Sequence, residues 1–115
     1  MQSRSIKPAT REEKRRFEAI VEIGCICCIH DGHEPIRPAE VHHLLDGGVR
    51  RGHSLSIANC SWHHRGVPPS GFNQKQATAF IGPSLALDGK AYHAHYGSDG
   101  DLLAFQEFLL KEYSQ

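Results

Sequence analysis

The chain has 115 residues, of which 39% are hydrophobic, and its 13 Lys and Arg are balanced by 13 Asp and Glu. This length suits one domain with a modest core, and the zero net charge gives no support by itself to a nucleic-acid partner. No apolar run approaches the roughly 20 residues of a membrane-spanning helix, and the N-terminus lacks the apolar stretch of a signal peptide, so we expect a cytoplasmic protein without a membrane partner.

The first part of the chain predicts a flexible arm followed by a helix. Residues 1 to 9 are polar and basic, which suits a flexible basic arm. Thr10 and Glu13 form a capping-box pattern, and apolar residues then recur at helical spacing until Gly24. The exposed face of this helix would hold three cations that form either a solvated surface or a stripe facing phosphate: Arg11, Lys14 and Arg15.

The middle of the chain predicts a loop, two strands and a helix. Residues 25 to 37 show no periodicity and predict a loop or knuckle. A short strand is expected over residues 39 to 45, where it meets two glycines, and a second over residues 54 to 59. A short helix should begin near Ser61.

The last third predicts a long connection and a final helix. Residues 66 to 89 contain glycines and prolines, with one helical stretch expected near residues 73 to 80. Ser98 to Asp101 is a capping signal, and the apolar residues that follow share one helical face. Residues 1 to 75 hold 11 Lys and Arg against 8 Asp and Glu, whereas residues 76 to 115 hold 2 against 5, so a DNA-facing surface should lie in the first two thirds.

Four cysteines without an export signal favour metal binding over disulfides. Cys25 and Cys28 form a C-x-x-C pair, and Cys60 and His63 form a C-x-x-H pair, which together are a Cys₃His set that suits a structural zinc ion. The alternative is that these are buried cysteines that bind no metal. Cys27 could replace either of its neighbours as a ligand, and two nearby histidines could replace a ligand but are expected to be exposed: His30 and His33.

Two pairs of adjacent histidines form a second constellation, His42-His43 and His63-His64. Neighbouring strand residues point to opposite faces, so the first pair can share a site only where the strand bends or ends. Neighbouring helical residues diverge by about 100°. We therefore assign His63 to the zinc and His64, with His42, to a second metal; alternatively, one pair completes the zinc shell and the other is an exposed polar pair.

The run Val41-His42-His43-Leu44, followed by Cys60-x-x-His63-His64, resembles the motif of HNH endonucleases. The longer pattern adds Gly24-Cys25-Ile26-x-Cys28, His53 seven residues before Cys60, His64-Arg65-Gly66 and Tyr96-Gly97. This pattern is similar to the phage-type Ref family (recombination enhancement function) of RecA-dependent nucleases, over about residues 12 to 110.

The resemblance implies a role for each matching histidine. His43 would be the general base, His42 and His64 would bind the catalytic metal, and His53 would lie near the middle position of the motif, where Asn is commoner. The catalytic ion would be Mg²⁺, Mn²⁺ or Zn²⁺, and the substrate DNA, with DNA in a RecA filament as a candidate. A phage or prophage gene in a bacterial host is also implied.

The expected architecture is α+β: a small zinc-braced ββα-metal (HNH) domain over residues 10 to 115, with flanking N- and C-terminal helices. The expected function is metal-dependent DNA cleavage. The chief alternative is a non-catalytic zinc module that binds nucleic acid or a protein, in which all four motif histidines are structural ligands. Three arginines beside the motif are candidate phosphate contacts or ordinary surface charge: Arg50, Arg51 and Arg65.

Overall fold

The computed structural model describes residues 8–46, 49–50 and 55–113. Nearly all of the predicted arm, and His53, lie outside these ranges. The described elements make a small α+β structure, as predicted: α1 (Arg11–Ile23), α2 (Ile26–His30), β1 (Glu40–His43), β2 (Leu45–Asp46), β3 (Val49–Arg50), β4 (Ser56–Asn59), α3 (Ser61–Arg65), α4 (Gln74–Ile81), α5 (Gly89–Tyr96) and α6 (Asp99–Tyr113).

Local capping signals fix where the longer helices begin. Thr10 and Glu13 form both hydrogen bonds of the predicted capping box of α1. At α6 the Ser98 hydroxyl accepts from the Asp101 amide at 3.1 Å, and the Asp101 carboxylate accepts from the Ser98 amide at 3.0 Å. These reciprocal bonds satisfy amides that have no partner inside the helix, so the sequence predicts both starts.

Two helices depart from the sequence prediction. The segment predicted as a loop or knuckle contains the five-residue α2, and α5 occupies a stretch for which no helix was expected. α2 is too short to show an apolar period, and α5 alternates small, polar and aromatic residues without a clear apolar stripe. Both are held by tertiary contacts: Cys27, Cys28, Tyr92 and Tyr96 are buried in the core.

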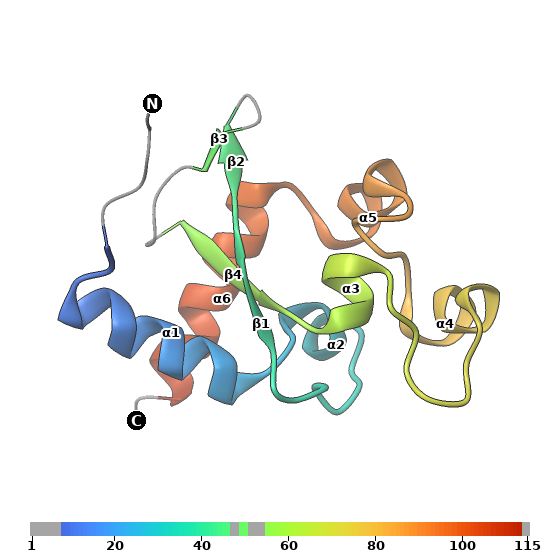
Figure 1. The fold of residues 1–115 in the computed structure, drawn as a ribbon, viewed down its shortest axis with the longest axis horizontal. Coiled ribbons are helices and arrows are strands. Elements are labelled where there is room, and N and C mark those ends of the chain that lie inside the picture. Colours follow the sequence, from blue (N-terminus) through green and yellow to red (C-terminus); the bar gives the residue numbers. More distant parts are fainter. Residues whose placement is uncertain (1–7, 47–48, 51–54, 114–115) are drawn as a thin grey trace.

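The centre of the fold is a two-stranded antiparallel sheet of β1 and β4. Its register pairs Glu40 with Asn59 and His43 with Ser56. β2 and β3 form a separate antiparallel pair between the two strands in sequence. Since α3 follows β4 directly, the predicted order of strand, loop, strand and helix is present, and β1 lies beside α3 (Figure 1).

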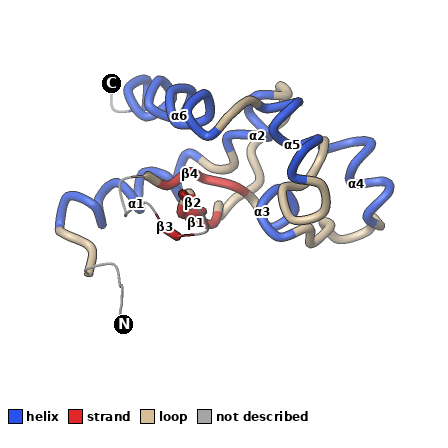
Figure 2. Tube along the Cα trace, turned by 90° about the horizontal axis from the view of Figure 1, so that it is seen from above, coloured by secondary structure: helices blue, strands red, loops and turns tan. Residues whose placement is uncertain are grey.

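Helices cover the sheet and enclose one core. α6 runs along one face of the sheet and also contacts α1, whereas α3, α4 and α5 lie at the end away from α1 (Figures 1 and 2). Among the described helices, none combines the length and apolar character needed to cross a membrane. The most deeply buried large side chains come from every layer: Ile20, Ile26, Leu44, Ile57, Trp62, Tyr92 and Leu102.

The outer edge of β4 is closed by a buried side chain from α6, and Arg16 of α1 also donates to the Ser56 carbonyl at 3.3 Å. Gln106 accepts a hydrogen bond from the Ala58 amide at 2.7 Å and donates one to the Ser56 carbonyl at 2.8 Å. Its side chain is fully buried. The amide therefore replaces the strand that would otherwise pair with this edge, and it fixes α6 against the sheet.

The substitution Gln106→Leu should lower the free energy of unfolding by about 2 kcal/mol, because an apolar side chain of similar size removes the side-chain acceptor of the buried Ala58 amide and one donor to the Ser56 carbonyl. Urea unfolding of the two proteins measures this difference. The exposed Glu112→Leu on the same helix is the matched control and should change stability by less than about 0.5 kcal/mol. Equal stability of the Gln106 variant and the unaltered chain would contradict the edge-closing role.

Candidate metal centre and histidine pair

Four buried ligand-type side chains converge between α2 and α3. The atoms that Cys25, Cys28, Cys60 and His63 offer to a metal all lie within 4.8 Å of one another. His63 Nδ1 lies 3.2 Å from the sulfurs of Cys25 and Cys60 and 3.8 Å from that of Cys28. This group, the cysteine cluster, could hold a metal ion, and it consists of the four residues that the spacing predicts.

The local chain path explains why the spacing works. Cys25 is the N-cap of α2 and Cys60 is the N-cap of α3. In each helix the second ligand follows three residues later, so both members of a pair face the same side of the first turn. The two helix starts are thus turned toward each other, and each supplies two donor atoms.

The hydrogen bonds within the cluster shift the acidity of its members in opposite directions. Burial opposes ionisation of Cys25, but hydrogen bonds from its neighbours outweigh it and hold the thiol pKa below its ordinary value. Hydrogen bonding to Cys25 raises the pKa of Cys28 to about 12. Burial alone would lower the pKa of His63, but hydrogen bonds to Cys25 and Cys60 raise it to about 10. Without an ion these shifts favour a Cys25 thiolate beside a protonated His63, whereas a cation would favour the thiolate form of all three sulfurs and a neutral imidazole.

His63 is oriented from its far side. Its Nε2 atom lies 3.0 Å from the Ile81 carbonyl and 2.9 Å from the Tyr96 hydroxyl. A hydrogen bond at Nε2 leaves Nδ1 as the atom directed at the three sulfurs, which is how histidine ligands of metals are commonly fixed. The end of α4 and the end of α5 therefore both help to position this ligand.

Cys27 does not belong to the cluster. Its sulfur lies 3.4 Å from the Tyr92 hydroxyl and 3.3 Å from the Asn59 amide nitrogen. Burial raises the pKa of its thiol above the ordinary value. The sequence left open which of the three neighbouring cysteines join the cluster. The structure places Cys25 and Cys28, and not Cys27, beside His63.

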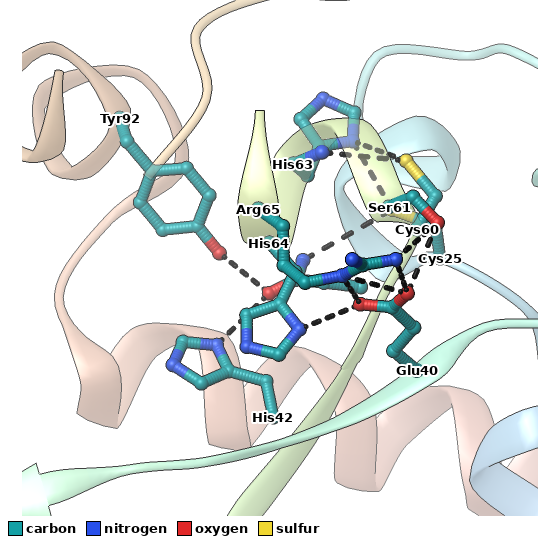
Figure 3. A network of polar contacts seen from close by, with 10 residues as sticks. Cys25, Glu40, His42, Cys60, Ser61, His63, His64, Arg65 and Tyr92 are labelled. Carbon is teal, nitrogen blue, oxygen red and sulfur yellow. Dashed lines mark hydrogen bonds and ion pairs between the residues drawn. The ribbon is translucent and has the colours of Figure 1, made fainter. Parts of the chain in front are cut away.

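A second group lies on the other side of α3, where His42 of β1 meets His64 (Figure 3). The two imidazole rings stack with centroids 4.6 Å apart and planes inclined by 23°. His42 Nδ1 contacts the Asn59 side-chain oxygen at 3.1 Å, and His64 Nδ1 contacts a Glu40 carboxylate oxygen at 2.8 Å. We call His42 and His64 the histidine pair.

Glu40 of β1 connects this strand to α3 beside the histidine pair. Its carboxylate accepts hydrogen bonds from Arg65 at 2.6 Å and from Ser61 at 3.0 Å, in addition to its contact with His64 (Figure 3). The Arg65 guanidinium is the main cause that holds the pKa of Glu40 at about 2. Arg65, a candidate phosphate contact from the sequence, is thus engaged by a carboxylate of the same chain.

Sequence reasoning missed three residues that shape this group: Glu40, Asn59 and Tyr92. A signal existed for the first, because residues two apart on a strand share a face, so Glu40 lies on the same face of β1 as His42. Asn59 is fully buried and also accepts a hydrogen bond from the Tyr92 hydroxyl at 3.1 Å. Nothing in the sequence predicts that α5 brings Tyr92 to this position.

The other predicted histidines are placed differently. The ring of His43 lies against Phe17 of α1, with centroids 5.8 Å apart, so β1 directs His42 and His43 to different neighbours. His53 lies outside the described residues. Although Glu40 contacts His64, no described Cys, His, Asp or Glu side chain forms with His42 and His64 a group whose ligand atoms all lie within 4.8 Å of one another.

Replacing one cluster cysteine should weaken metal binding, whereas replacing its neighbour Cys27 should not. We expect Cys28→Ala to lose at least tenfold in metal affinity and to unfold at a lower temperature, because metal binding to such a site contributes folding free energy. Cys27→Ala is the matched control and should keep one tightly held ion. Elemental analysis after dialysis measures both, and loss of metal from the Cys27 variant alone would reverse the assignment.

The chain matches one protein family over most of its length. Residues 9–111 match a family described as recombination enhancement, RecA-dependent nuclease. A comparison with curated individual proteins finds no match. The matched region includes the cysteine cluster and the histidine pair and spans nearly the whole chain, so the chain belongs to the family of RecA-dependent nucleases of recombination enhancement.

Proposed function

We propose that the chain is a metal-dependent DNA endonuclease of the HNH type. The observation that best supports this is the meeting of His42 from β1 with His64 from α3, whose ring centroids are 4.6 Å apart. These residues would hold the catalytic divalent ion, while the cysteine cluster would hold a structural zinc ion. The proposed domain comprises residues 10 to 115, and residues 1 to 9 form an arm.

The hydrogen bonds of the histidine pair leave one nitrogen of each ring available to an ion. Among the described residues, the hydrogen bond of each ring uses its Nδ1 atom, with Asn59 and Glu40 as the respective partners. The Nε2 atoms therefore stay open to an ion, and the hydrogen bonds fix the orientation of both rings. The ligands would thus come from β1, which pairing with β4 holds in place, and from α3, which the cysteine cluster holds in place.

The donor atoms also limit the choice of ion. Neutral imidazole nitrogens suit Mn²⁺, Co²⁺, Ni²⁺ or Zn²⁺ better than Mg²⁺, although Mg²⁺ remains a candidate for turnover. A divalent ion in this position would supply charge neutralisation for the phosphodiester and for the oxygen that leaves it. The expected products bear a 5′ phosphate and a 3′ hydroxyl.

His43 is the proposed general base, and His53 is proposed to lie near the active site. An imidazole with a pKa near neutrality can take a proton from the attacking water. In the structure the His43 ring lies edge to face with that of Phe17, and His43 is the last residue of β1.

The proposed substrate is single-stranded or displacement-loop DNA presented by a RecA filament. The chain has no net charge, and counterion release from Lys and Arg contacts is the main source of affinity for bare DNA. One exposed arginine beside the site is already paired with Glu40. A protein partner that holds the DNA would compensate for the absence of excess positive charge.

Three alanine variants test the catalytic assignment. We expect His42→Ala, His64→Ala and His43→Ala each to lower the cleavage rate at least 100-fold on DNA bound by RecA and ATP, with Mn²⁺ or Mg²⁺, because each removes a metal ligand or the base. His33→Ala, an exposed histidine outside the histidine pair, is the control and should cleave normally. Zinc content should stay unchanged in all four. If only His43→Ala remains active, the nuclease proposal survives and the base is another group.

A second measurement tests the RecA requirement. Purified protein with a divalent ion should leave naked circular single-stranded and supercoiled duplex DNA uncut, and it should cut after RecA and ATP are added. Equal cutting with and without RecA would contradict the substrate proposal. No cutting under any condition, with one tightly held zinc ion and no exchangeable metal at the histidine pair, would instead favour the non-catalytic zinc module.

A further inference from the structure

A third group of ligand-type side chains lies at the surface where the end of α2 meets α5. His30 and Asp31 come from the end of α2, and His95 comes from α5. Their ligand atoms all lie within 4.8 Å of one another. His30 Nδ1 and His95 Nε2 approach the same oxygen of Asp31, at 3.0 Å and 2.9 Å.

We propose that His30, Asp31 and His95 form a binding site for a divalent transition-metal ion of the Zn²⁺ or Ni²⁺ type, separate from both the cysteine cluster and the histidine pair. Two imidazole nitrogens and one carboxylate oxygen are a donor set that these ions favour. Three protein ligands leave coordination positions for water. This site does not depend on the proposed nuclease activity.

The carboxylate of this site is held in place before any ion binds. The second oxygen of Asp31 accepts a hydrogen bond from the Tyr96 hydroxyl at 2.8 Å. Gly82 makes this contact possible, because a Cβ atom there would collide with the Tyr96 hydroxyl and would lie 3.1 Å from Asp31. A carboxylate ligand with one oxygen fixed by a hydrogen bond keeps the other directed at the ion.

The ligands are also accessible to ions from solvent. The side chains of His30 and His95 are 40% and 48% exposed, and that of Asp31 is 15% exposed. The rings of His30 and His95 meet edge to face with centroids 5.7 Å apart. An ion can therefore enter without unfolding of either helix, and small rotations of two exposed rings are enough to direct both nitrogens at it.

A bound ion would connect parts of the molecule that the chain leaves far apart. It would join residues 30 and 31 to residue 95, and the Tyr96 hydroxyl that contacts Asp31 also lies 2.9 Å from His63 Nε2. α5 further supplies Tyr92, which contacts Asn59. The ion would thus stabilise the packing of α5 against the cysteine cluster, and its binding should raise the melting temperature.

The test uses the untagged, zinc-loaded protein with Ni²⁺ as the probe, so that added ions are counted apart from bound zinc. The double variant His42→Ala/His64→Ala serves as the background, because it removes the histidine pair. Equilibrium dialysis should find one Ni²⁺ per chain in this background, and Ni²⁺ should raise its melting temperature.

Variants of the site decide the outcome. Adding His30→Ala or Asp31→Asn to the background should weaken Ni²⁺ binding at least tenfold and remove the rise in melting temperature, with zinc content unchanged. His33→Ala is the matched control, since it is an exposed histidine three residues from His30 and outside the group, and it should bind Ni²⁺ as the background does. Absence of Ni²⁺ binding in the background, or equal binding by the His30 variant, would overturn the proposal and leave a hydrogen-bonded triad without an ion.

Discussion

Three buried sulfurs surround the Nδ1 atom of His63, and this cluster joins two segments that 31 intervening residues separate in the chain. Neither α2 nor α3 is long enough to be stable alone, since each has five residues. Their positions therefore depend on the cluster and on the core around it. Because β4 leads directly into α3, the same cluster also determines where the sheet ends.

Because His63 and His64 are adjacent, the cysteine cluster also constrains the position of the proposed metal ligand His64. The two side chains leave a short helix in different directions, one into the cysteine cluster and the other toward His42. Fixing the first ring thus fixes the backbone that presents the second. Asn59 adds a further link, because its side chain contacts His42 on one side and Cys27 on the other. A change in the cysteine cluster is therefore expected to reach the proposed active site through α3 itself.

Structural features that depend on local or periodic patterns could be predicted from the sequence, and features that depend on long-range contacts could not. The ligand spacing predicts the cysteine cluster, and the capping residues predict the starts of α1 and α6, because each signal acts within one helical turn. The exclusion of Cys27 depends on Asn59 and Tyr92, which are 32 and 65 residues away. The separation of His42 from His43 follows from the alternation of side chains along a regular strand, since the two residues could share a site only where the strand bends or ends. In the structure β1 stays paired through His43, so its two histidines contact different neighbours.

The number of ligands in the histidine pair has a consequence for how the proposed enzyme binds its ion. Catalytic zinc sites commonly use three protein ligands, and only two described side chains converge here. An ion held by two neutral imidazoles gains little from charge attraction, so its affinity in the free protein should be low. A phosphate oxygen of DNA would add both a ligand and a negative charge. Binding of the ion and binding of DNA should therefore reinforce each other, and a partner that positions the phosphodiester would strengthen both. In a chain without net charge, this coupling gives a physical reason for a nuclease to act only on DNA that a filament already holds.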